Sequence, residues 1–138
     1  MPAVLFVCVA NSARSQLAEA IARHLRPDLD VVSAGSAPTR VRPQVPEVLR
    51  EVGIDAYGLR AKSLFEIPFD EITVAVTLCS EAQCPVLPRA VRHISWPLPD
   101  PASAPDHEAL EAFRATRDEL MRRIPPLLDE VAPPPRRR

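Results

Sequence analysis

The sequence is poor in lysine, asparagine and glycine, and it lacks any long apolar run. Among its 138 residues, Lys62 is the only lysine, Asn11 is the only asparagine, and there are three glycines. No apolar stretch approaches the roughly 20 residues that a membrane-spanning helix needs, and the first residues do not have the pattern of a signal peptide. The net charge of −1 gives no general attraction for nucleic acid or anionic membranes. We therefore expect a cytoplasmic protein without nucleic-acid or membrane partners.

The remaining composition is that of an ordinary globular domain, except for its prolines. Apolar residues make up 46% of the chain and charged residues 25%, which is typical of a soluble domain with one substantial core. The 17 prolines, together with the scarcity of lysine and asparagine, are produced either by a GC-rich genome or by adaptation to heat. The sequence does not separate these two origins.

Segments typical of strands and helices alternate along the chain. Apolar and β-branched runs predict strands at residues 2–8, 30–34, 72–78 and 91–95. Apolar residues at helical spacing predict helices at residues 15–26, 43–52 and 106–131, with a short helix near residues 63–67. Pro125 and Pro126 are expected to kink or split the last helix near its end.

This alternation predicts an α/β fold of three layers, α/β/α. A four-stranded parallel sheet would carry helices on both of its faces. We expect a single α/β domain over residues 1–132 and a flexible tail of proline and arginine over residues 133–138.

A cysteine and an arginine bracket a five-residue loop between the first strand and the first helix. The loop runs from Cys8 through Val9, Ala10, Asn11, Ser12 and Ala13 to Arg14. Backbone N–H groups at a helix N-terminus lack partners and the helix dipole is positive there, so residues 9–14 can bind an oxyanion, two of whose oxygens Arg14 can hold. The same field favours the thiolate form of Cys8. This pattern predicts a nucleophile facing a tetrahedral oxyanion; the alternative is a buried strand-end cysteine with a surface arginine.

Asn11 stands inside this loop, which contains no glycine. Asparagine tolerates a positive φ angle, and its side chain can bond to nearby backbone groups. We expect Asn11 to provide the tight turn that the loop needs. The alternative is that it occupies a neutral position by chance.

Two further cysteines follow the third predicted strand. Cys79 stands at the end of that strand, and Cys84 follows five positions later. Because the carboxyl ends of parallel strands share one edge of a sheet, Cys79 is expected near Cys8. His93 and His107 do not complete the spacing of a zinc site, so no metal is expected there. Three cysteines are an odd number, and in the cytoplasm we favour a redox pair beside Cys8 over a pair of inert thiols.

Asp100 lies in a rigid turn, Pro99-Asp100-Pro101, that follows the fourth predicted strand. A carboxylic acid held over the active edge of the sheet could protonate an oxygen that leaves a thiolate-bound oxyanion. The alternative is an ordinary Asp-Pro turn without a function.

The chain resembles the low-molecular-weight protein tyrosine phosphatases and the arsenate reductases built on the same fold. The resemblance lies in residues 8–16, 33–35, 76–84 and 100–101, and it extends to residues 111–119 in the last helix. Both groups share the Cys-x5-Arg-Ser motif, whereas the segment with Cys79 and Cys84 resembles that of arsenate reductases coupled to thioredoxin. The resemblance implies a low-molecular-weight phosphatase-like fold and the reduction of arsenate to arsenite, an activity of arsenic detoxification.

The resemblance also implies a relay of three cysteines. Cys8 would attack arsenate held by residues 9–14, and Asp100 would protonate the departing oxygen. Cys79 would then attack Cys8 and release arsenite, and Cys84 would attack Cys79 to leave a disulfide for thioredoxin to reduce. Ser15 would stabilise the Cys8 thiolate by a hydrogen bond, would be the N-cap of the helix, or would do both.

Two departures from the family bear on the site. Ala10 stands where the family often has glycine, so the loop depends more on Asn11 for its turn. Some relatives bind potassium through residues that match Asn11, Glu19 and Ser33, but the carboxylate that they add is replaced here by Ser63. We therefore expect no metal and no cofactor.

Three hypotheses for the function follow, and they belong to different classes. The favoured one is a thioredoxin-dependent arsenate reductase, with phosphate as a competing anion and weak phosphatase activity. A phosphatase acting on phosphomonoesters through phospho-Cys8 and a non-catalytic oxyanion or redox sensor are the alternatives. Glutaredoxin or a small thiol stays open as the electron donor, and a monomer is the default expectation.

Overall fold

The computed structural model describes residues 2–80, 84–88 and 91–133, so the predicted tail lies almost wholly outside the described residues. The strands are β1 (Ala3–Cys8), β2 (Asp30–Gly35), β3 (Val74–Thr77) and β4 (Arg92–Ser95). The α-helices are α1 (Arg14–Leu25), α2 (Gln44–Arg50) and α3 (Asp106–Val131), and the 3-10 helices are η1 (Leu64–Glu66), η2 (Phe69–Glu71) and η3 (Pro101–Ser103). Each predicted strand and helix is present, with ends that differ by at most two residues.

The strands form one parallel sheet in the order β2-β1-β3-β4. All six residues of β1 are buried, as expected for an apolar strand with a neighbour on each side. The register pairs Val7 with Ala34 on β2 and with Thr77 on β3. The carboxyl ends of these three strands therefore lie side by side at one edge of the sheet, and Cys8 stands at that edge.

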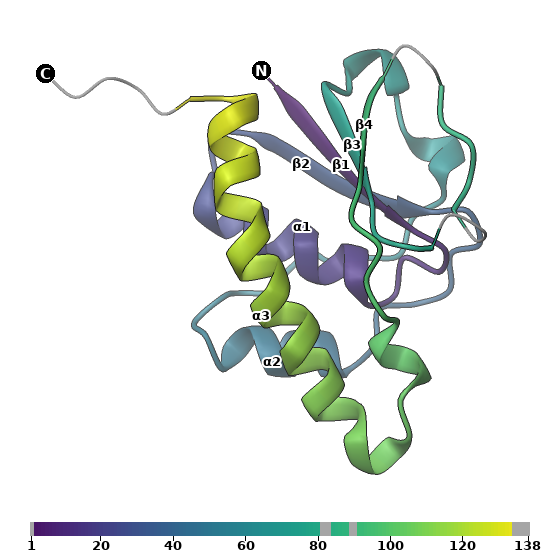
Figure 1. The fold of residues 1–138 in the computed structure, drawn as a ribbon, viewed down its shortest axis with the longest axis vertical. Helices are drawn as coiled ribbons and strands as arrows, with labels where there is room; N and C mark the ends of the chain where they lie inside the picture. The colour runs from purple at the N-terminus through teal and green to yellow at the C-terminus, as the bar shows by residue number, and fades with distance from the viewer. Residues whose placement is uncertain (1, 81–83, 89–90, 134–138) are drawn as a thin grey trace, which may run out of the picture.

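The two faces of the sheet are covered differently (Figure 1). On one face, α1, α2 and α3 pack on the side chains of Val4, Phe6, Val74 and Val76. On the other face, the residues that contact Leu5, Val7, Ala34 and Ala75 come largely from the segment that contains η1 and η2. The sheet thus lies between two layers, which confirms the predicted α/β/α arrangement. The three α-helices are on one face, and the 3-10 helices η1 and η2 are on the other.

Helix α3 runs unbroken through Pro125 and Pro126 as one element of 26 residues, so the expected split near its end is wrong. Buried side chains on both sides of the prolines hold the last turns on the core: Ile124, Leu127 and Leu128. The prolines cannot donate to the carbonyl groups one turn earlier, which belong to Met121 and Arg122. Both residues are exposed, so water can take the place of the missing donors.

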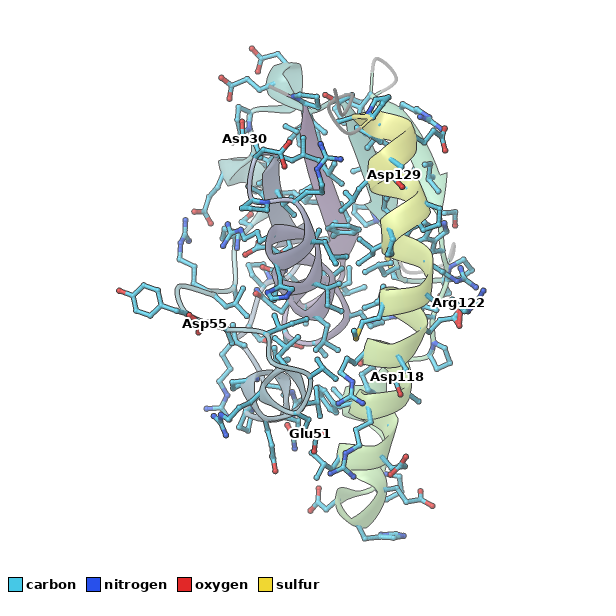
Figure 2. The ribbon with its side chains drawn as sticks, turned by 90° about the vertical axis from the view of Figure 1, so that its left-hand side faces the viewer. Asp30, Glu51, Asp55, Asp118, Arg122 and Asp129 are labelled. Atoms are coloured by element: carbon cyan, nitrogen blue, oxygen red, sulfur yellow. A yellow bond between two sulfur atoms is a disulfide. The ribbon has the colours of Figure 1, made fainter. Side chains whose placement is uncertain are left out.

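An ion-pair cluster joins the end of α2 to α3. Glu51 directly follows α2 and lies between the two helices (Figure 2). It accepts hydrogen bonds from Arg114 Nη2 and from Arg117 Nη1, each at 2.7 Å. These hydrogen bonds lower the pKa of Glu51 from 4.5 to about 2. Arg117 also donates to the Val48 carbonyl at 2.9 Å, so the cluster fixes the backbone of α2 to α3.

Candidate active site

The loop between β1 and α1 forms most of a small cavity. Cys8 is the last residue of β1, and Arg14 is the first residue of α1. The cavity has a volume of about 340 Å³ and is lined by Cys8, Val9, Ala10, Ser12, Ala13, Arg14 and Asp100. Of the predicted oxyanion-binding residues 9–14, all except Asn11 therefore share one cavity with the predicted nucleophile.

Gly35 allows this loop to lie directly against the end of β2. A Cβ atom at residue 35 would be 2.4 Å from the Val9 carbonyl oxygen and 2.9 Å from the Asn11 nitrogen, so only glycine fits. Three loop carbonyls accept backbone hydrogen bonds from the segment that follows β2: Val9 from Ala37, Ala10 from Thr39 and Ser12 from Arg42. These bonds engage the carbonyls of the loop and leave its N–H groups as the donors available to an anion.

Asn11 has the left-handed conformation that the loop requires, with a φ angle of 49°. Its side chain is fully buried and donates through Nδ2 to Ser15 Oγ at 2.7 Å and to Ser33 Oγ at 2.9 Å. Its Oδ1 atom accepts a hydrogen bond from the Lys62 backbone N–H at 2.7 Å. Asn11 therefore supports the loop from behind and does not line the cavity.

Ser15 contacts the predicted nucleophile. Its Oγ atom lies 2.8 Å from Cys8 Sγ. Because Ser15 Oγ accepts a hydrogen bond from Asn11, its own hydrogen can be donated to the sulfur. The N-cap interpretation is wrong, since α1 begins at Arg14 and Ala13 occupies the N-cap position without a side-chain hydrogen bond.

The Arg14 guanidinium is held in place by two backbone carbonyls. Its Nη1 atom donates to the Leu78 carbonyl at 3.2 Å and to the Leu98 carbonyl at 3.1 Å. Its Nε atom is buried, and no group in the described part of the chain accepts a hydrogen bond from it. Arg14 is thus fixed by one nitrogen while Nε stays available, as binding of an anion in the cavity requires.

Asp100 is far from the loop in the sequence, but it lines the same cavity. Its carboxylate lies 3.9 Å from Arg14 Nη2, and its side chain is 40% exposed. Its Oδ1 atom also accepts a hydrogen bond from the Ala102 backbone N–H at 3.0 Å, which caps η3. The turn therefore holds a partly solvated carboxyl group beside the guanidinium that faces the cavity.

Cys79 and Cys84 form a disulfide, and Cys8 is the free cysteine. The Leu78 N–H donates to the Val7 carbonyl at 2.8 Å, so the end of β3 is bonded to the end of β1. Cys79 directly follows Leu78, and Cys8 directly follows Val7. Both cysteines therefore stand one residue beyond this hydrogen bond. Cys79 is fully buried, whereas Cys84 is partly exposed. The geometry places the predicted redox pair at the same edge of the sheet as Cys8.

Two buried residues near the loop are absent from the predicted site, Gln16 and Lys62. Gln16 Nε2 donates to both the backbone and the side-chain oxygen of Asn11, each at 3.0 Å, and to the Arg60 carbonyl at 2.8 Å. Lys62 Nζ lies 3.3 Å from Glu19 Oε1, and both side chains are buried. The sequence shows that Lys62 is the only lysine and that it precedes Ser63, but its contact with Glu19 comes only from the structure.

The residues matching that potassium site do not fit a metal ion here. Glu19 Oε1 already receives the Lys62 ammonium and a hydrogen bond from Ser33 Oγ at 2.8 Å. Elsewhere, across residues 2–80, 84–88 and 91–133, no group of three histidine, cysteine or acidic side chains is arranged to hold a metal. The same residues contain no helix long and apolar enough to cross a membrane.

Clearly shifted pKa values occur outside the cavity. The pKa values of Asp28, Glu51 and Glu119 are lowered by hydrogen bonds from neighbouring arginines. The pKa of Glu66 is lowered by the Ser63 backbone N–H and by Arg60. These groups therefore affect stability rather than the chemistry of the cavity.

Comparisons with known proteins agree with this geometry. The profile of the family described as low molecular weight phosphotyrosine protein phosphatase matches residues 3–134. An arsenate reductase of Halalkalibacterium halodurans is 34% identical over 126 residues, which cover 88% of this chain and 91% of that protein. An arsenate reductase of Staphylococcus aureus is 38% identical over 120 residues, which cover 85% of this chain and 88% of that protein.

Solved structures are similar over nearly the whole length. An arsenate reductase in the phosphate binding state has a TM-score of 0.82 and 33% identity, covering 96% of this chain and all of that one. A low molecular weight protein tyrosine phosphatase from T. tengcongensis has a TM-score of 0.77 and 27% identity, covering 94% of this chain and 99% of that one. The predicted low-molecular-weight phosphatase-like fold is thereby confirmed.

Proposed function

The chain belongs to the low molecular weight phosphotyrosine protein phosphatase family, and from that premise we propose that it is an arsenate reductase that works through Cys8, Cys79 and Cys84. The observation that carries the proposal is the Cys79–Cys84 disulfide at the strand end next to the loop of the free Cys8. Hydrolysis of a phosphate ester needs only the loop and an acid. Two further cysteines at this edge are what a two-electron reduction requires.

In the first step, the Cys8 thiolate attacks arsenate bound in the cavity. The loop N–H groups and Arg14 hold the oxyanion, and phosphate, which has the same shape and charge, competes for the site. A sulfur–arsenic bond forms while an arsenic–oxygen bond breaks. Asp100 gives its proton to the departing oxygen, which leaves as water. The hydrogen bond from Ser15 to Cys8 favours the thiolate before attack.

In the second step the cysteines pass an electron pair to arsenic, and in the third step the resulting disulfide moves from Cys8–Cys79 to Cys79–Cys84. The Cys79 thiolate attacks Cys8 Sγ, the electron pair of the sulfur–arsenic bond stays with arsenic, and arsenite leaves as As(III). The Cys84 thiolate then attacks Cys79 Sγ, and Cys8 departs as a thiolate. The bonded Cys79–Cys84 pair with a free Cys8 corresponds to the protein after this last step.

Thioredoxin is the proposed reductant of the Cys79–Cys84 disulfide. Cys84 is partly exposed, so a protein dithiol can approach this disulfide, and the internal pair removes the need for an external thiol at the second step. Glutaredoxin with glutathione and small thiols are the competing donors. A monomer in the cytoplasm is the corresponding expectation for assembly and location.

A phosphatase activity is the second candidate, because the family and the cradle around Cys8 favour it. A phosphate ester in the cavity would form phospho-Cys8, with Asp100 protonating the leaving alcohol. We expect this as a weak side activity, since no step of it uses Cys79 or Cys84.

The test is arsenate turnover by cysteine variants with purified donors added one at a time. Cys84→Ser should release about one arsenite per protein and then stop, and Cys79→Ser should release none, because each variant removes one step of the relay. Both variants should keep the wild-type hydrolysis of p-nitrophenyl phosphate, whereas Cys8→Ser should lose both activities. Normal arsenate reduction by a Cys79→Ser, Cys84→Ser double variant would overturn the relay. Absence of turnover with every donor would indicate a sensor.

A further inference from the structure

We propose that the Lys62 ammonium is a built-in cation that positions Cys8 for reaction, so that this protein does not need a monovalent metal ion. The proposal rests on the role of Cys8 in the proposed function. It makes Lys62 a positioning residue, because Lys62 acts on Cys8 through other side chains and does not touch the cavity. It also explains why residues that match a potassium site do not fit a metal here.

The first step is the burial of the chain's only lysine against a buried carboxylate. Lys62 is 8% exposed and Glu19 is 1% exposed. A buried charge needs a partner of the opposite sign and hydrogen bonds to its remaining atoms. Lys62 Nζ lies 3.3 Å from Glu19 Oε1 and donates to the Arg60 carbonyl at 2.8 Å. Lys62 thus supplies a compact ammonium charge. The other lysine-or-arginine positions of the chain are all arginines, whose guanidinium groups are larger and planar.

The second step is a chain of hydrogen bonds in which each bond determines which group donates in the next one. An ionised Glu19 can only accept, so the Ser33 hydroxyl donates to it at 2.8 Å. Ser33 Oγ then accepts from Asn11 Nδ2 at 2.9 Å, which fixes the orientation of the Asn11 amide. The other hydrogen of that amide goes to Ser15 Oγ at 2.7 Å. The Ser15 hydrogen is therefore directed to Cys8 Sγ at 2.8 Å, where it stabilises a thiolate.

The third step is a second connection from Lys62 to the loop. The Lys62 backbone N–H donates to Asn11 Oδ1 at 2.7 Å, and the Lys62 carbonyl accepts from the Gly35 N–H at 2.9 Å. One residue thereby fixes the acceptor end of the Asn11 amide through its backbone and the donor end through Glu19. Without the ammonium, Arg23 still contacts Glu19 Oε2, but Oε1, which accepts from Ser33, loses its cation, and a small cation from solution can take that place.

The experiment compares wild type and Lys62→Met in potassium, sodium and N-methylglucamine chloride at equal ionic strength. Two readouts do not depend on arsenate: the melting temperature, and the rate at which iodoacetamide alkylates Cys8 in the form with the Cys79–Cys84 disulfide, where Cys8 is the free thiol. Arsenate turnover is the third. Failure of turnover alone would count against the proposed function, and the first two readouts would still test Lys62.

Wild type should behave alike in all three salts. Lys62→Met should alkylate about tenfold more slowly in N-methylglucamine, as expected for loss of a hydrogen bond to a charged sulfur. Potassium or sodium should restore much of that rate and raise the melting temperature by roughly 3–5 °C at tenfold excess over its Kd. A structural role of Lys62 alone would lower stability equally in the three salts.

Two variants serve as controls. Arg23→Met removes the other cation of Glu19, which lies 3.1 Å from Oε2 on a side chain that is nearly half exposed, and it should show no cation response. The double variant Glu19→Gln, Lys62→Met removes both charges of the buried pair and should also be insensitive to the salt.

The result that would overturn the proposal is a Lys62→Met protein with wild-type alkylation in all three salts, or one whose defect no small cation relieves. If Lys62→Met does not fold in N-methylglucamine, folding on addition of potassium or sodium supports the proposal. Failure to fold in every salt overturns it.

Discussion

Ser15 Oγ lies 2.8 Å from Cys8 Sγ and accepts a hydrogen bond from Asn11, which leaves the Ser15 hydrogen for the sulfur. This pair is buried at the junction of β1 and α1, where the N-terminus of the helix adds a positive field. The reactivity of Cys8 therefore depends on a hydroxyl group whose orientation is set by residues behind the loop.

Replacing Ser15 by alanine should slow the reaction of Cys8. Loss of a hydrogen bond to a charged group costs about 1.5–3 kcal/mol, which corresponds to roughly 10–100-fold in rate. The measurement is the alkylation rate of Cys8 and the kcat for arsenate. Ser15→Thr keeps the hydroxyl and is the matched control; a Ser15→Ala protein as fast as wild type would remove Ser15 from the mechanism.

Replacing Asn11 should separate its backbone role from its side-chain role. Asn11→Gly loses the buried hydrogen bonds but still tolerates the φ angle of 49°. Asn11→Ala loses the same hydrogen bonds and also disfavours this φ angle. We expect both variants to be less stable than wild type, with alanine worse than glycine by about 1 kcal/mol. Urea denaturation measures the difference, and equal stability of the two variants would mean that the left-handed conformation imposes no cost.

Asp100→Asn should lose activity without losing stability. Asparagine caps a helix as well as aspartate does, so η3 stays intact, but the amide cannot protonate a leaving oxygen. We expect kcat for arsenate to fall by about 100-fold and the melting temperature to stay near that of wild type. Asp100→Ala should lose both. An Asp100→Asn protein with unchanged kcat would show that another group, or water, delivers the proton to the leaving oxygen.

Glu51→Gln should lower stability in a pH-dependent way. The pKa of Glu51 falls from 4.5 to about 2 in the folded protein, because Arg114 and Arg117 donate hydrogen bonds to the carboxylate. The stabilisation is therefore complete above pH 4.5 and is lost as the pH falls toward 2.

Melting temperatures of wild type and Glu51→Gln should accordingly differ above pH 4.5 and converge as the pH approaches 2. Glu111→Gln is the matched control, since Glu111 contacts the same Arg114 with a side chain that is 79% exposed, and its effect should be small throughout. A difference for Glu51→Gln that does not change with pH would place the effect in packing rather than charge.

Local sequence patterns were sufficient for most of the fold. Continuous apolar runs predicted the strands, and α3 was predicted with its observed bounds at residues 106–131, because its apolar residues repeat at helical spacing. The start of the third strand was predicted too early, since the Ile72 N–H bonds to Phe69 in η2 and not to a neighbouring strand. The prolines of α3 were misjudged because burial of the flanking side chains outweighs the lost hydrogen bonds.

The sequence by itself determined the chemistry at the edge of the sheet: a thiol, an arginine and a loop that enters a helix are adjacent in the chain, so their meeting requires no knowledge of packing. Which groups lie behind that loop was decided only by the tertiary structure. Lys62, Glu19 and Ser33 are far apart in sequence, and burial brings them together because each charged or polar atom must find a partner away from water. The sequence shows that Lys62 is the only lysine, but it does not show that Lys62 lies beside Glu19.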